Sequence, residues 1–133
     1  MSETGERHLP SWLTVSTDAA PPTGALVVSG TEGRSRAGLF TGWAAALSFP
    51  DYFGHNWDAL LDCLRDLVAR GPRTLVVTDA TDLLADEPPA QFATLLAVLA
   101  SAVEETDQGL RVVLHTPAAT APVLHRRLTA ALR

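Results

Sequence analysis

The sequence has few of the residues that would commit it to a disulfide, a zinc site or a membrane. Its 133 residues include one cysteine, Cys63, which excludes an internal disulfide and cannot build a cysteine zinc site by itself. All ten basic residues are arginine, against fifteen acidic ones, so the net charge is −5 and nucleic acid is repelled overall. No stretch approaches the roughly 18 apolar residues of a membrane helix. We therefore expect neither a nucleic-acid partner nor a membrane association.

The composition is that of one folded domain. Hydrophobic residues make up 47% of the chain and charged residues 19%, which is ordinary for a globular protein. The first residues lack the basic start and apolar run of a signal peptide, so we expect a cytoplasmic protein. The last 13 residues contain three arginines and no acid. The acidic excess therefore lies in the rest of the chain, where it favours basic partners.

Apolar runs and amphipathic segments alternate along the chain and predict an α/β fold. Three short apolar runs have the character of buried strands: 25–28, 74–78 and 110–114. Apolar spacing and boundary residues predict four helices: 34–47, 57–70, 88–105 and 122–132. The order β-α-α-β-α-β plus a C-terminal helix predicts a three-stranded parallel sheet with right-handed connections.

Both ends of the chain are predicted to lie outside a central domain at 24–116. Residues 1–23 contain Pro10, Pro21 and Pro22 among small polar residues, and we interpret them as an N-terminal extension, although 12–16 has strand character. Residues 117–133 form a C-terminal helical extension, which is too short to be stable alone and must pack on the domain.

Three carboxylates are predicted to share the outer face of the second helix. Asn56 is the expected N-cap, and Asp58 lies in the first turn, where a negative charge is favourable. On a helical wheel Asp62 and Asp66 lie about 40° and 80° from Asp58, while the leucines point to the other side. Like charges four residues apart cost roughly 0.2–0.5 kcal/mol per pair. The stripe is either a binding surface or a solvated helix face, and its pattern alone does not choose.

The segment before this helix combines aromatic residues with a glycine. Aromatic side chains beside charges are typical of binding hot spots. Phe53 is better interpreted as core, whereas Tyr52 is equally compatible with a role facing a partner. Gly54 is expected to permit the turn before the helix.

Residues 47–64, with the sequence LSFPDYFGHNWDALLDCL, resemble the signature of the barstar family of intracellular inhibitors of small secreted ribonucleases. The resemblance implies a barstar-like fold over 24–116 and no catalytic activity, cofactor or metal. It also implies a 1:1 complex with a small basic ribonuclease, guanyl-specific and secreted. The family's binding tyrosine falls on Tyr52, and its partner-facing aspartates fall on Asp58 and Asp62, with Asp62 inserted deepest at a phosphate subsite.

The family's backbone-contacting loop falls on residues 54–56. The predicted partner-binding residues are therefore Tyr52, Gly54, His55, Asn56, Trp57, Asp58 and Asp62. The chain departs from the family at Leu61 and Leu67, where aromatic residues are frequent, and the second change removes a peripheral contact. The family's acidic contact on its last long helix falls on Glu104 or Glu105, and the resemblance does not choose between them.

Two other functions are compatible with parts of the sequence. His55, Asp58 and Asp62 have a spacing that could converge on a cation in a metal-dependent hydrolase, although no complete ligand set is recognisable. A barstar-like module could also bind another basic toxin or a regulatory protein, because a fold does not define a partner. Cys63 lies near the core edge with no recognisable activating base, which favours an inert thiol.

Overall fold

The computed structural model describes residues 9–18, 21–107 and 109–132. The elements follow one another as β1 (Leu13–Ser16), β2 (Leu26–Ser29), α1 (Arg36–Ala46), α2 (Trp57–Ala69), β3 (Arg73–Thr78), the short 3₁₀ helix η2 (Ala80–Asp82), α3 (Pro89–Glu105), β4 (Leu110–His115) and α4 (Ala121–Ala131). The three predicted strands and four predicted helices are confirmed, with each boundary within two residues of its expected place.

The sheet has four parallel strands in the order β1-β4-β3-β2, so the predicted three-stranded sheet is wrong in its number of strands. The additional strand is β1, which pairs with β4 in a register that places Leu13 beside Val112. Residues 12–16 have strand character, but the strand with which they pair lies about a hundred residues away in sequence, so no local pattern indicates that they join the sheet. The segment interpreted as an extension therefore forms one edge of the sheet. The predicted division at residues 23 and 116 stays a prediction.

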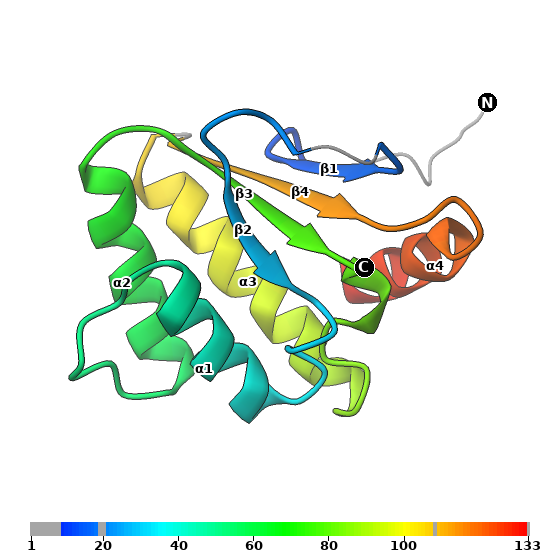
Figure 1. Cartoon of the computed structure of the whole chain (residues 1–133), viewed down its shortest axis with the longest axis horizontal. Helices are drawn as coiled ribbons and strands as arrows, with labels where there is room; N and C mark the ends of the chain where they lie inside the picture. Colours follow the sequence, from blue (N-terminus) through cyan, green and yellow to red (C-terminus); the bar gives the residue numbers. More distant parts are fainter. Residues whose placement is uncertain (1–8, 19–20, 108, 133) are drawn as a thin grey trace.

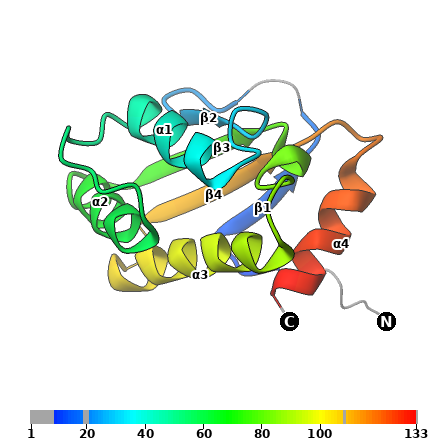
Figure 2. The same cartoon turned by 90° about the horizontal axis from the view of Figure 1, so that it is seen from below.

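Three helices cover the same face of this sheet. The steps from β2 to β3 and from β3 to β4 each move one position in the same direction, so right-handed connections place α1, α2 and α3 together. Figures 1 and 2 show these helices on one side of the strands, with α4 beyond the end of β4, on the side of the sheet where β1 forms the edge. The helix pair α1 and α2 therefore forms one end of the helical layer, and the loop between its two members is free to face a partner.

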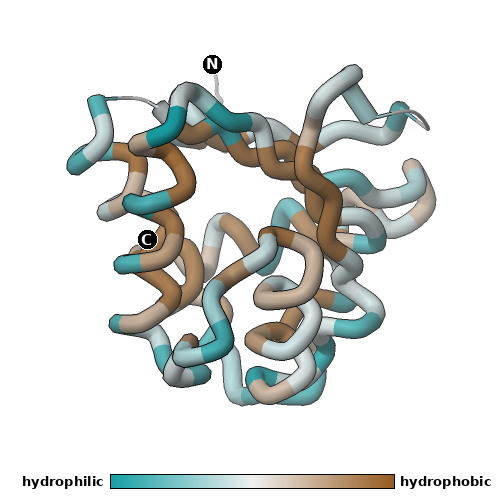
Figure 3. The backbone as a smooth tube through the Cα atoms, turned by 60° about the vertical axis from the view of Figure 1, so that its left-hand side comes forward, coloured by the Kyte–Doolittle hydropathy of each residue, from teal (hydrophilic) through white to brown (hydrophobic). Residues whose placement is uncertain are grey.

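The core lies between the sheet and this helical layer. Along β4, Leu110, Val112 and Leu114 are at most 1% exposed and belong to the core, as alternation along a strand requires. The predicted core faces of the helices are confirmed by the burial of residues such as Trp43 and Leu99. Figure 3 shows the resulting alternation of hydrophobic and hydrophilic stretches along the backbone.

Helix α4 is attached to the body by polar contacts as well as by buried leucines. The hydroxyls of Thr81, Thr116 and Thr120 form a chain with oxygen separations of 2.7 and 2.6 Å. Arg127 donates to the Thr81 carbonyl at 2.9 Å and lies 4.2 Å above the Phe92 ring. Burial of this guanidinium lowers the pKa of Arg127. These contacts join α4 to η2 and α3, far along the chain from the acidic stripe of α2.

The role of β1 is testable by truncating its buried side chain. Leu13 is 3% exposed, so Leu13→Ala is expected to lower the free energy of unfolding by about 2–4 kcal/mol in urea denaturation. Thr14→Ala is the matched control on the exposed side of the same strand, and we expect a change within about 0.5 kcal/mol. Equal stabilities of the two variants would show that β1 is not part of the cooperative core.

Candidate functional site

The loop between α1 and α2, residues 47–56, is held in place by aromatic packing. Phe53 is 7% exposed, which confirms its predicted place in the core. Its ring centroid lies 6.0 Å from that of Phe40 in an edge-to-face arrangement and 5.1 Å from that of Phe49. Phe40 also meets the half-buried ring of Trp57 edge-to-face at 5.0 Å. Such pairs stabilise beyond the area they bury, so the loop and the first residue of α2 share one anchor.

Tyr52 lies on the opposite side of the loop. With Phe53 pointing inward, the neighbouring Tyr52 side chain is 85% exposed, the highest value among the large hydrophobic side chains that the structure describes. The sequence left its orientation open. An exposed tyrosine next to a rigid anchor can bury a large area on binding at little cost in side-chain entropy.

Asn56 caps α2, as its position predicts. Its extended backbone allows Oδ1 to accept a hydrogen bond from the Ala59 amide at 2.8 Å, while Nδ2 donates to the Gly54 carbonyl at 3.1 Å. One carboxamide therefore satisfies a free amide of the first turn and also holds the preceding loop. The start of the acidic helix and the conformation of the loop depend on the same side chain.

Gly54 lies before the N-cap of α2, where it contributes space rather than a positive φ. The left-handed residue of the turn is His55, with a φ of 49°, whereas Gly54 has no positive φ. Histidine is among the residues that tolerate this region, and the His55 ring lies 5.1 Å from that of Phe53. Gly54 provides space instead, because a Cβ atom there would lie 3.1 Å from Nδ2 of Asn56.

The three carboxylates of α2 are exposed, as the helical wheel predicts. Asp58, Asp62 and Asp66 face solvent, whereas Leu60 and Leu64 on the other side are fully buried. The helix thus places its three carboxylates on the side away from its buried leucines. This acidic stripe, defined as Asp58, Asp62 and Asp66, lies on the same element that Asn56 caps, so the loop with Tyr52 leads directly into it.

One cation lies within the acidic stripe. Arg65 donates to Oδ1 of Asp62 at 2.8 Å, and its other terminal nitrogen forms an ion pair with Glu105, the last residue of α3. The side chains of Asp62, Arg65 and Glu105 are 71%, 39% and 45% exposed. Of the two glutamates that the sequence left open, Glu105 is therefore the one tied to this surface. The pairing joins residues 40 positions apart, and no local pattern predicts it.

Cys63 has the properties of an unreactive thiol. Partial burial raises the pKa of Cys63, and the nearby carboxylates of Asp66 and Asp62 raise this pKa further. A higher pKa leaves less thiolate at neutral pH, and the thiolate is the nucleophile.

The structure also bears on metal and membrane alternatives. Among residues 9–18, 21–107 and 109–132, no group of three or more His, Cys, Asp or Glu side chains could hold a metal ion. The spacing of His55, Asp58 and Asp62 therefore does not become a ligand set. Within the same described ranges, no helix is long and apolar enough to cross a membrane.

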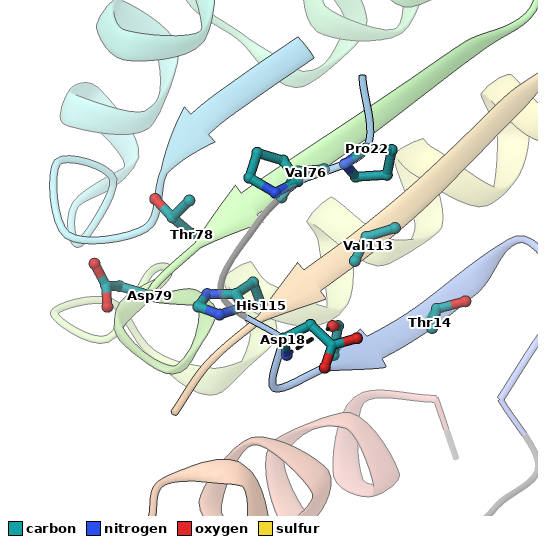
Figure 4. A pocket seen from close by; sticks show the side chains of 10 residues that line it. Thr14, Asp18, Pro22, Val76, Thr78, Asp79, Val113 and His115 are labelled. Carbon is teal, nitrogen blue, oxygen red and sulfur yellow. Dashed lines mark hydrogen bonds between the residues drawn. The ribbon is translucent and has the colours of Figure 1, made fainter. Parts of the chain in front are cut away.

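A pocket on the other face of the sheet contains none of the predicted site residues. It has a volume of about 330 Å³ and lies between β1, β3, β4 and the segment containing Pro21 and Pro22. Figure 4 shows Asp18, Asp79 and His115 toward one end of the pocket and Val76, Val113 and Pro22 further along the strands. No local sequence pattern indicates this pocket, because it exists only when β1 pairs with β4.

Fold and site together define a small α/β protein that carries three helices on one face of a parallel sheet and exposes an acidic stripe beside a tyrosine. A family model for barstar, described as barnase inhibitor, matches residues 24–115. The match covers more than half of the chain and includes the capped helix and its loop, so the chain belongs to the barstar family. Strand β1 and helix α4 lie outside the matched residues. No curated protein matches the chain.

The capping role of Asn56 predicts a defined loss of stability. Asn56→Ala removes the acceptor for the Ala59 amide and is expected to cost about 1 kcal/mol in the free energy of unfolding, measured in urea. Asn56→Asp is the matched control, since it keeps an oxygen acceptor and adds a charge that the helix N-terminus favours. A loss in the aspartate variant as large as in the alanine variant would contradict the capping role.

The raised pKa of Cys63 predicts slow alkylation that increases with pH. Because the neutral thiol is favoured in the folded protein, the iodoacetamide reaction rate should rise with a midpoint above the ordinary thiol pKa. Asp66→Asn should lower that midpoint, since the Asp66 carboxylate contributes to the shift. The rate in the urea-unfolded chain is the reference. A folded protein that reacts as fast as the unfolded chain would contradict this environment.

Proposed function

We propose that this protein inhibits a small, secreted, guanyl-specific ribonuclease by covering its basic active site with the acidic stripe of α2 and the loop before it. The observation that carries the proposal is the barstar family match over 24–115, which contains both the loop and the stripe. The proposed complex is 1:1, and the proposed place of action is the cytoplasm. Inhibition here means occupation of the active site, with no chemical step on either protein.

The proposed roles divide between charge and shape. Asp62 takes the place of an RNA phosphate among the cationic residues of the ribonuclease, and Asp58 supports it one turn earlier on the helix. The high exposure of Asp62 supports this assignment, since its carboxylate can approach a partner without prior rearrangement of the fold. A carboxylate carries the charge of a phosphate but offers no bond for the ribonuclease to cleave.

Tyr52 and the backbone of residues 54–56 form the uncharged part of the proposed interface. The Tyr52 ring stands out from the loop and can fill a depression on the partner, while the amides and carbonyls of the loop can pair with partner groups. Trp57 supports this interface by positioning α2: its half-buried ring packs against Phe40 and fixes the start of the helix. Anchors packed in this way lower the ordering cost of association.

The net charge of the chain suits a basic partner. An excess of acidic residues raises the rate of encounter with a basic protein, and the effect weakens as salt screens the charges. The proposed function therefore includes an association rate that falls with ionic strength. An enzyme inhibited through apolar contacts alone would not show this dependence.

The direct test mixes the purified protein with several small secreted guanyl-specific ribonucleases and measures residual RNA cleavage together with binding by calorimetry. We expect stoichiometric loss of cleavage with at least one of them. If the protein neither binds nor inhibits any of these enzymes, the ribonuclease proposal is wrong. Calorimetric titration of wild type and of His55→Ala with zinc or magnesium tests the metal-dependent alternative. That alternative requires stoichiometric metal binding by wild type that is lost in His55→Ala.

Substitutions along the acidic stripe test the proposed orientation of α2. Asp62→Ala is expected to weaken binding to the inhibited ribonuclease by about 2 kcal/mol or more, the size of a hot-spot effect. Asp66→Ala removes the same charge one turn further from the loop and is expected to cost less, because rim charges contribute little. Equal losses at the two positions would refute this orientation.

A further inference from the structure

We infer that Arg65 determines which basic partners the acidic stripe accepts, because it places one positive charge directly beside Asp62. This inference rests on the proposed function and concerns a residue for which that function gives no role. Arg65 is a positioning and specificity residue rather than a member of the proposed contact set.

The contacts of Arg65 hold its guanidinium at the stripe. One terminal nitrogen donates to Oδ1 of Asp62 at 2.8 Å, and the other forms the ion pair with Glu105 on α3. The inner nitrogen, Nε, is buried and has no hydrogen-bond partner among the described residues. The stem of the side chain is thus covered while its charged end is fixed between two helices. A partner approaching Asp62 meets this cation at a defined place.

The pairing leaves one oxygen of Asp62 for a partner. Arg65 occupies Oδ1, and no hydrogen bond from the described residues reaches Oδ2. A partner cation bonded to Oδ2 would lie only one carboxylate group away from the guanidinium. That separation is well inside the screening length of about 8 Å at physiological salt, so the two cations would repel each other with little screening.

Glu105 makes it costly for Arg65 to move aside. The ion pair ties the guanidinium to the last residue of α3, where the free carbonyls of a helix end favour a positive charge. When a partner binds the Asp62 carboxylate, Arg65 keeps its ion pair with Glu105 and therefore remains close to Asp62. The repulsion is therefore part of the complex and is not relieved by a simple change of side-chain conformation.

The consequence is a preference between partners. A ribonuclease that surrounds Asp62 with several cations is penalised by Arg65. A second kind of ribonuclease places its cations at Oδ2 and a carboxylate or carbonyl opposite Arg65. Such a partner is favoured, because the Arg65 nitrogen that donated to Asp62 can then donate to the partner's oxygen. Specificity of this kind works by rejecting the wrong partner as well as by attracting the right one.

The test compares Arg65→Gln with Arg70→Gln against the same panel of ribonucleases. Both variants remove one positive charge, one from α2 and one from its C-cap, but Arg70 is exposed at the helix end, eight residues and about 12 Å along the axis from Asp62. For the enzymes that wild type binds weakly, Arg65→Gln should strengthen binding about tenfold, and Arg70→Gln less than about twofold. For the enzyme that wild type binds best, Arg65→Gln should bring no gain.

A double-mutant cycle with Asp62→Ala identifies the source of the effect. Once Asp62 is removed, Arg65→Gln should change affinity no more than Arg70→Gln does, because the charge that Arg65 offsets is absent. The urea midpoint of each variant is measured in parallel. The double variant Arg65→Gln, Glu105→Gln repeats the comparison without leaving Glu105 as an unpaired charge, since it removes both members of the ion pair between α2 and α3.

The outcomes separate this inference from the function on which it rests. If Asp62→Ala weakens binding but Arg65→Gln and Arg70→Gln behave alike across the panel, Arg65 is only a structural link, and this inference is wrong while the inhibitor function stands. If neither wild type nor Arg65→Gln binds any ribonuclease, the proposed function fails and this inference fails with it.

Discussion

The packing of Phe53 against Phe40 and Phe49 is the contact on which the rest of the surface depends. It holds the loop between α1 and α2 at its centre, so the residue before it, Tyr52, must point outward. After it the chain turns at His55 and reaches Asn56, whose own backbone is extended, as a helix N-cap requires. The origin of α2, and with it the direction of every carboxylate on that helix, follows from this buried ring.

The charges of α2 are arranged at some cost to the helix itself. Carboxylates four residues apart repel each other, and the first of them is compensated by the helix N-terminus. Arg65 offsets the second by pairing with Asp62, and it extends the compensation to Glu105 on α3. An exposed ion pair of this kind adds little to the stability of the fold. Its main effect is on the electrostatic field that an approaching partner experiences at the acidic stripe.

Local chemistry made much of the fold predictable. Asn56 before Trp57 and Gly71 after the helix define both ends of α2, and apolar spacing of three and four identifies Leu39, Phe40 and Trp43 as core. The strand character of 12–16 was recognisable, but the place of β1 in the sheet was not, because it depends on pairing with β4 about a hundred residues away. The residue of the turn before α2 that takes the positive φ was not predictable for a related reason, since this residue is His55, whose ring packs beside Phe53.

Sequence by itself determined the order of helices, the core faces, the cap at Asn56 and the segregation of Asp58, Asp62 and Asp66 from the leucines. These features depend on residues within one or two turns of each other, where spacing translates directly into geometry. Only the tertiary structure decided the exposure of Tyr52, the fourth strand and the contact between Arg65 and Glu105. The last two join segments far apart in the chain, and the outward direction of Tyr52 follows from the packing of Phe53 against Phe40 on α1; such contacts exist only after the core has brought the segments together.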